Sequence, residues 1–188
     1  MTNSDRDVLS RFSSNPRKRE IAYHEASRAV ISMRLGGDVT GIELCDAGND
    51  DLERWALIHG NGLGTCKYLE KATSCLVGPL VECLVSGGDE SDPDLGAFDR
   101  ISCYLIEHQG TAGVTEDLQE AWMALSIVCA FDLQDDRQLS ERLAAWQWLT
   151  TRTYRFALEH WGEISEVAEE LLAQGVVSDE RLKAVVHW

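Results

Sequence analysis

Basic residues are scarce in this chain of 188 residues. It has 17 lysines and arginines against 32 aspartates and glutamates, so the formal net charge at pH 7 is −15. Proteins that bind nucleic acids or anionic membrane surfaces neutralise phosphate groups with clustered lysine and arginine. The densest cationic stretch here, residues 17–19, is followed at once by Glu20. We therefore expect no nucleic-acid partner and no anionic membrane surface as a partner.

Long hydrophobic runs are also missing. The longest run, Ala121–Phe131, is about half of the roughly 20 residues that a membrane-spanning helix needs. The first residues, Met1–Phe12, contain neither the basic region nor the apolar region of a secretory signal. These two absences predict no membrane insertion and a cytoplasmic protein.

None of the 6 cysteines stands in a Cys-x-x-Cys pair, which argues against a zinc ribbon and against a thioredoxin-like redox motif. We expect reduced, mostly buried thiols. With 44% hydrophobic residues, 26% charged residues and only 3 prolines, the chain can build an ordinary packed core. The sequence predicts a flexible N-terminal arm over residues 1–14 and a single folded domain over 15–188.

The spacing of apolar residues predicts a mainly α domain (α+β) with one small antiparallel β hairpin. Helices are expected at about 16–35, 68–85, 93–108, 115–131, 140–161 and 164–174, with a last short helix after Ser178 and strands at 39–44 and 54–59. Proline lacks a backbone donor, so Pro79 should bend or split the second of these helices. Gly162 is a possible break, and Gly175 should end the helix before it.

The segment Tyr23-His24-Glu25-Ala26-Ser27-Arg28 carries the clearest chemical pattern. In an H-E-x-x-H helix, two histidines four residues apart bind zinc on one face, and the glutamate activates the metal-bound water. Here the first histidine and the glutamate are present, but position 28 is arginine. A guanidinium stays protonated and has no lone pair to offer a metal, so Arg28 cannot be a ligand.

The stretch Ile21–Ala26 resembles the active helix of the peptidase domain of FtsH-type ATP-dependent zinc metalloproteases. Gly78-Pro79-Leu80-Val81-Glu82 is similar to a Gly-x-Ala-Ala-Glu segment of that family, and Asp92–Leu95 to its Asn-Asp-Leu. The resemblance extends over roughly residues 16–186. It implies a zinc-metallopeptidase-like helical fold, zinc ligands at His24 and Asp94, and a general base at Glu25. The resemblance covers only the peptidase part of that family, so we expect a stand-alone domain without the family's ATPase domain or membrane anchor.

The departure at Arg28 leaves two ligands, whereas a catalytic zinc ordinarily has three protein ligands and a water. Our hypothesis is that Arg28 stands where the metal would be and pairs with Asp94 or Glu25, which leaves the site metal-free and Glu25 a vestigial base. No cofactor is then expected, and Zn²⁺ only if the domain is active. A plain alternative for Asp94 is an aspartate favoured by a helix N-terminus, and Asp92 or Asp99 could take its place.

Three interpretations stay open. The one we favour is an inactive pseudopeptidase that binds a protein or peptide between the hairpin and the helix of His24. The second is an active zinc metalloendopeptidase that recruits a substitute ligand. The third is a structural helical domain that forms oligomers. The partner is expected to be a protein or peptide, with a homo-oligomer or a separate ATPase as further possibilities, and the oligomeric state stays open.

Overall fold

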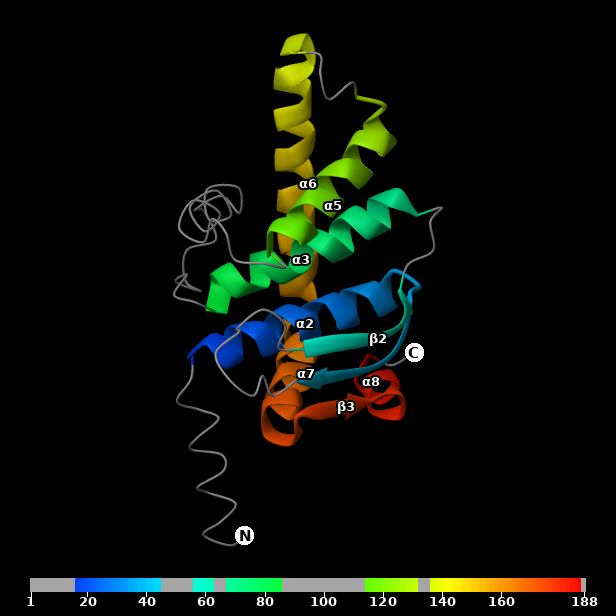
Figure 1. The fold of residues 1–188 in the computed structure, drawn as a ribbon, viewed down its shortest axis with the longest axis vertical. Coiled ribbons are helices and arrows are strands. Elements are labelled where there is room, and N and C mark those ends of the chain that lie inside the picture. Colours follow the sequence, from blue (N-terminus) through cyan, green and yellow to red (C-terminus); the bar gives the residue numbers. More distant parts are fainter. Residues whose placement is uncertain (1–15, 45–55, 63–66, 86–113, 132–135, 187–188) are drawn as a thin grey trace, which may run out of the picture.

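The computed structural model describes residues 16–44, 56–62, 67–85, 114–131 and 136–186 (Figure 1). The elements are α2 (Pro16–Arg34), β1 (Asp38–Leu44), β2 (Ala56–Gly62), α3 (Tyr68–Val85), α5 (Val114–Cys129), the 3-10 turn η1 (Asp136–Gln138), α6 (Leu139–Glu159), α7 (Trp161–Gln174), β3 (Val176–Ser178) and α8 (Asp179–Val186). The predicted fold class, mainly helical with a small antiparallel sheet, is confirmed. None of the described helices combines the length and the apolar character needed to cross a membrane.

The sheet has three strands in the order β2-β1-β3, all antiparallel. The predicted hairpin forms β1 and β2, with Ile42 opposite Ile58, although β2 begins and ends later than expected. The third strand was not predicted. Gly175 adopts a left-handed conformation (φ 77°) that ends α7, and its carbonyl accepts a hydrogen bond from the Leu44 N–H (2.8 Å). Val177 then pairs with Ile42.

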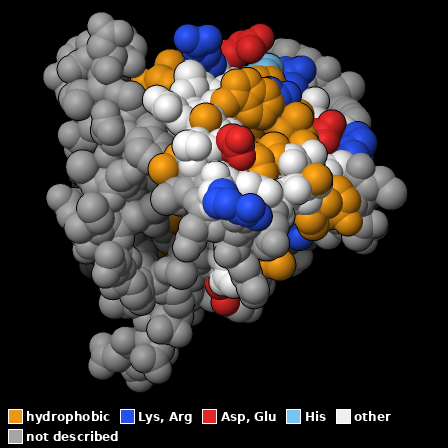
Figure 2. Space-filling view, turned by 90° about the horizontal axis from the view of Figure 1, so that it is seen from above, with side chains coloured by type: hydrophobic (Ala, Val, Ile, Leu, Met, Phe, Trp, Pro, Cys, Tyr) orange, Lys and Arg blue, Asp and Glu red, His pale blue; other side chains and the backbone are white. Residues whose placement is uncertain are grey.

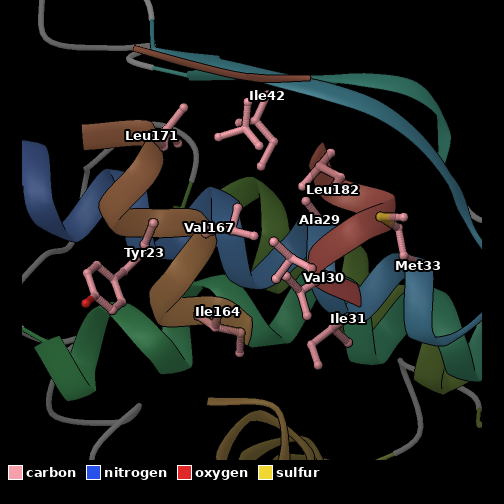
Figure 3. Close-up of a cluster of buried hydrophobic side chains, with 14 of the residues drawn as sticks. Tyr23, Ala29, Val30, Ile31, Met33, Ile42, Ile164, Val167, Leu171 and Leu182 are labelled. Carbon is pink, nitrogen blue, oxygen red and sulfur yellow. The ribbon is translucent and has the colours of Figure 1, made fainter. Parts of the chain in front are cut away.

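The larger hydrophobic cluster lies between the sheet and helices α2, α7 and α8 (Figure 3). Ile42 of β1 meets Leu171 of α7 and Leu182 of α8, and all three side chains are fully buried. The α2 residues that face this cluster include Ala22, Ala26 and Ala29, whose small side chains let the neighbouring helix approach closely. The apolar periodicity of α2 and α7 is thus satisfied by one shared core.

A second hydrophobic cluster joins α3, α5 and α6. Leu76 and Leu80 of α3 pack there with Leu125 of α5 and Leu149 of α6, all nearly inaccessible to solvent. Because α3 also packs along α2, it lies between the two clusters (Figure 1). The flank of α2 that turns away from the sheet is consequently buried as well.

The helices differ from the sequence-based expectation at two places, Pro79 and Gly162. Pro79 does not split α3, which is continuous from Tyr68 to Val85; the helix is buried on several sides, and this packing outweighs the one backbone donor that proline lacks. The expected bend at Pro79 stays a prediction. The break between α6 and α7 falls at His160 (φ −104°, ψ 16°) and leaves Gly162 in the first turn of α7. The arm 1–14 and the helix expected at 93–108 lie outside the described residues.

Candidate functional site

His24 and Arg28 lie one turn apart on α2, on the flank that faces α3 and α5. The apolar residues of α2 lie on another side of the same helix. Because Ala22 and Ala26 are packed into the core, the rotation of α2 is set, and His24 and Arg28 are directed toward the neighbouring helices. His24 is 6% exposed. The H-E-x-x-R pattern therefore lies in the interior of the described fold.

The imidazole of His24 is held from both sides by carboxylates. Its Nδ1 lies 3.2 Å from Oε2 of Glu82 on α3, and its Nε2 lies 3.0 Å from Oδ2 of Asp117 on α5. The side chains of both acids are at most 10% exposed. This geometry uses both ring nitrogens as donors, which is the arrangement of a protonated imidazolium.

The charge state of His24 follows from these neighbours. Burial alone would lower the pKa of His24, but the hydrogen bonds to Asp117 and Glu82, together with the negative charge of Glu25, raise this pKa from 6.5 to about 10. At neutral pH the ring is therefore a cation between two carboxylates. It has no free lone pair to offer a metal in this state.

Arg28 is the second cation of the site, and its side chain is partly buried (29% exposed). Its Nη1 lies 3.3 Å from Oδ1 of Asp117 and 3.8 Å from Oε2 of Glu25. Burial would lower the pKa of Arg28, but Glu25 and Asp117 raise it above its ordinary value. Asp117 thus bridges the two cations, one with each carboxylate oxygen. We refer below to His24, Glu25, Arg28, Glu82 and Asp117 as the His24 cluster.

Glu25, the expected vestigial base, is partly buried beside Arg28. Burial raises the pKa of its carboxyl, while the charges of His24 and Arg28 act in the opposite direction. With Glu25, the cluster sets three acidic groups against two cations.

Gly78 on α3 allows the His24 ring to fit. A Cβ atom built at Gly78 would overlap the imidazole at Nε2, Cδ2 and Cε1. One turn before it, the buried thiol of Cys75 donates toward Oε2 of Glu120 (3.5 Å). Burial, with the nearby Asp117 and Glu120, raises the pKa of Cys75 to about 12, so the thiol stays protonated and unreactive. Cys75, Cys83 and Cys129, the cysteines among the described residues, form no disulfide, and the first two are buried.

The donor set of the described residues does not fit a zinc ion. Within them, no group of three or more histidine, cysteine, aspartate or glutamate side chains is arranged to hold a metal. His24 has both nitrogens engaged by carboxylates, and Arg28 puts a positive charge where a second histidine would be. A dication placed beside the imidazolium and the guanidinium would be repelled by both.

Sequence reasoning named some of these residues and missed others. His24, Glu25 and Arg28 come together as expected from their spacing on one helix. Asp94, with its alternatives Asp92 and Asp99, lies outside the described residues.

The two carboxylates that hold the imidazole were not assigned a role. Glu82 carries a usable signal, because it stands alone among apolar residues of a buried helix and so needs a partner. Asp117 carries none, because an acid in the first turn of a helix is favoured without any partner.

Comparison of the sequence with models of known protein families gives no match, and comparison with curated proteins gives none either. The function is therefore argued from the cluster itself.

Proposed function

We propose that this chain is a non-catalytic, pseudopeptidase-like domain that binds a protein or peptide segment. The observation that carries the proposal is the His24 imidazole, which is held between Glu82 and Asp117 while Arg28 contacts the other oxygen of Asp117. The resemblance of Ile21–Ala26 to the FtsH-type peptidase helix supplies the peptidase-like part of the proposal.

The cluster performs the role that a bound cation would otherwise have. A buried carboxylate without a partner costs several kcal/mol, so Glu82 and Asp117 require positive charge nearby. His24 and Arg28 supply it from the same helix. Hydrolysis of an amide in the manner of H-E-x-x-H enzymes needs a metal-activated water and a free glutamate base. Here Glu25 is beside Arg28 instead, so the described residues support binding over catalysis.

The sheet supplies a place for an extended segment. In the order β2-β1-β3, β1 is paired on both sides, whereas β2 has a neighbour on one side only among the described strands. α2 packs against both β1 and β2, so this edge lies next to the helix that carries the His24 cluster (Figure 1). An edge strand with free backbone groups can take up an added peptide strand.

Metal content and hydrolysis test the first half of the proposal. Protein purified without chelator should contain far less than one zinc per chain, and should not cleave a casein-like substrate with added zinc or with chelator. The Arg28→His variant is the matched comparison, because it restores the second histidine; uptake of zinc by the variant alone would support the proposal. Stoichiometric zinc in the unmodified protein, with chelator-sensitive cleavage, would establish the active metallopeptidase instead.

Backbone-modified peptides test the second half. Peptides selected from a random library for binding to the protein should lose about tenfold in affinity when alternate backbone amides are N-methylated, because each lost amide donor removes an inter-strand hydrogen bond. Methylation of the intervening amides should have little effect, since these point away from β2. If no peptide is selected from the library, the structural interpretation replaces the binding one.

A further inference from the structure

The outward face of α6 carries two arginines that have no acidic partner among the residues that the structure describes. Arg152 and Arg155 are exposed, while Leu149, Thr153 and Ala157 on the same helix point into the protein. Neither arginine forms an ion pair with any described residue. Glu159, four residues after Arg155, is exposed as well and does not pair with it.

Elsewhere on the described surface several basic side chains lie beside carboxylates, and the face in Figure 2 shows Lys or Arg side chains next to Asp or Glu side chains. The described basic side chains that contact carboxylates include Arg19, Arg28, Arg34, Lys71, Arg181 and Lys183. In a chain with 32 acidic residues and a net charge of −15, two neighbouring arginines with no carboxylate of the described part of the chain beside them are unusual. Two like charges at i and i+3 also weaken a helix slightly.

One of these arginines is held in place by its neighbours. The Arg152 guanidinium carbon lies 5.6 Å from the ring centroid of Trp148, within the range of a cation–π contact. Its Nη1 donates to the Thr73 hydroxyl oxygen on α3 at 3.4 Å. Trp148 is itself 52% exposed, so an aromatic face and an ordered guanidinium are presented to solvent together.

The same side chains line a concavity. Trp148, Thr151, Arg152, Arg155, Phe156 and Glu159 border an open hollow of about 400 Å³. Its lining thus includes two guanidinium groups, the indole of Trp148 and the carboxylate of Glu159. The hollow therefore offers two forked donors and one apolar surface to a ligand.

We propose that this face of α6 is a docking surface for an acidic segment of a partner protein that carries an aromatic or aliphatic side chain. Carboxylates match the planar fork of arginine, which can bind them through two parallel hydrogen bonds. The apolar side chain of the partner packs on Trp148, as exposed tryptophan and arginine residues do at the centres of interfaces. A nucleic acid would meet the same two arginines, but it carries a phosphate at every nucleotide, so a chain with a net charge of −15 repels it more strongly than a short segment with two or three carboxylates.

A labelled peptide tests the surface directly. The probe is a short fluorescein-labelled peptide in which glutamates flank a single phenylalanine, and its reference is the same peptide with glutamine for glutamate. Fluorescence anisotropy should show binding of the glutamate peptide only, with an affinity that falls as salt is raised. Arg155→Gln and Arg152→Gln should each weaken binding about tenfold, because each removes a charge-assisted contact.

Matched variants separate a local site from a general charge effect. Lys183→Gln changes the net charge by the same amount as Arg155→Gln but lies on α8, so it should leave binding unchanged. Glu159→Gln should tighten binding, because it removes the one carboxylate that borders the hollow. Trp148→Ala, at an exposed position, should weaken binding of the phenylalanine peptide more than that of a peptide with alanine in its place.

The proposal is overturned if the glutamate and glutamine peptides bind equally, if Lys183→Gln weakens binding as much as Arg155→Gln, or if the glutamate peptide binds no more tightly than about 1 mM. A single-stranded oligonucleotide that competes for the same arginines with higher affinity would overturn it in favour of a nucleic-acid ligand. The test is independent of peptide addition at β2, which none of these variants touches.

Discussion

The two flanks of α2 are both buried, but they are buried in opposite ways. Toward the sheet and α7, residues such as Ala22 and Ala29 join a purely apolar core. Toward α3 and α5, His24 and Arg28 enter a cluster of charges. An apolar contact is not directional, so many arrangements satisfy it. Each buried charge instead requires a particular partner, so the ionic flank should be far less tolerant of change.

The largest expected effect comes from Asp117→Asn. This change removes the carboxylate that His24 and Arg28 share, so each cation loses its shortest ion pair; only Glu82 then remains beside His24, and Glu25 beside Arg28 at 3.8 Å. Breaking a buried ion pair from one side typically costs about 3–5 kcal/mol, and we expect a loss of this size in the free energy of unfolding measured with urea.

The control is Glu166→Gln, an equally isosteric change in the exposed pair with Arg181. It should shift the urea midpoint far less, because solvent screens that pair. A loss for Asp117→Asn no larger than that of the control would remove the distinction between the flanks.

The next effect is a dependence of stability on pH. The pKa of His24 is raised to about 10 in the folded protein from an ordinary value of 6.5. Between these values the folded state binds more protons than the unfolded state, so the free energy of unfolding falls as pH rises. The contribution is complete below pH 6.5 and is lost as the pH passes through about 10.

Urea unfolding at a series of pH values checks this dependence, with His24→Gln as the reference that lacks the titrating group. The unmodified protein should lose more stability than the variant over that interval. Parallel pH profiles for the two proteins would mean that His24 is not held as a cation.

A smaller effect is expected from Gly78→Ala. The added methyl group would overlap the His24 ring, so either the ring or α3 must move, at a cost of about 1–3 kcal/mol. Gly162→Ala is the matched control: nothing lies within 4 Å of the added atom, and alanine favours a helix over glycine by about 0.5–1 kcal/mol. The two variants should therefore shift the thermal midpoint in opposite directions. Equal shifts would mean that the His24 ring is not tightly enclosed.

The flanks of α2 also differ in how much of them the sequence predicts. The range of α2, the apolar stripe that runs through Ile164 and Leu171 and the turn at Gly175 follow from local spacing, and the structure has them where they were expected. Local spacing also puts His24 and Arg28 on one edge of the helix. It does not say which acids meet that edge.

The missing information is long-range. Asp117 is 93 residues away from His24 in the chain, and its contact depends on how α3 and α5 dock against α2. The strand β3 was not predicted for a related reason. Its three residues are too few to show an alternating pattern, and only their pairing with β1 makes them a strand. In both cases the sequence does not reveal which distant residue or strand makes the contact.

The turn at Gly175 has a consequence for how the protein can be shortened. Residues after it place β3 against β1, so that the central strand has a neighbour on either side. A chain cut just before that turn would expose the backbone of β1 beside Ile42. An unprotected strand edge of this kind favours edge-to-edge aggregation. The described residues that follow Gly175 thus protect β1 from pairing with a strand of another molecule. A fragment meant to stay soluble should therefore retain them.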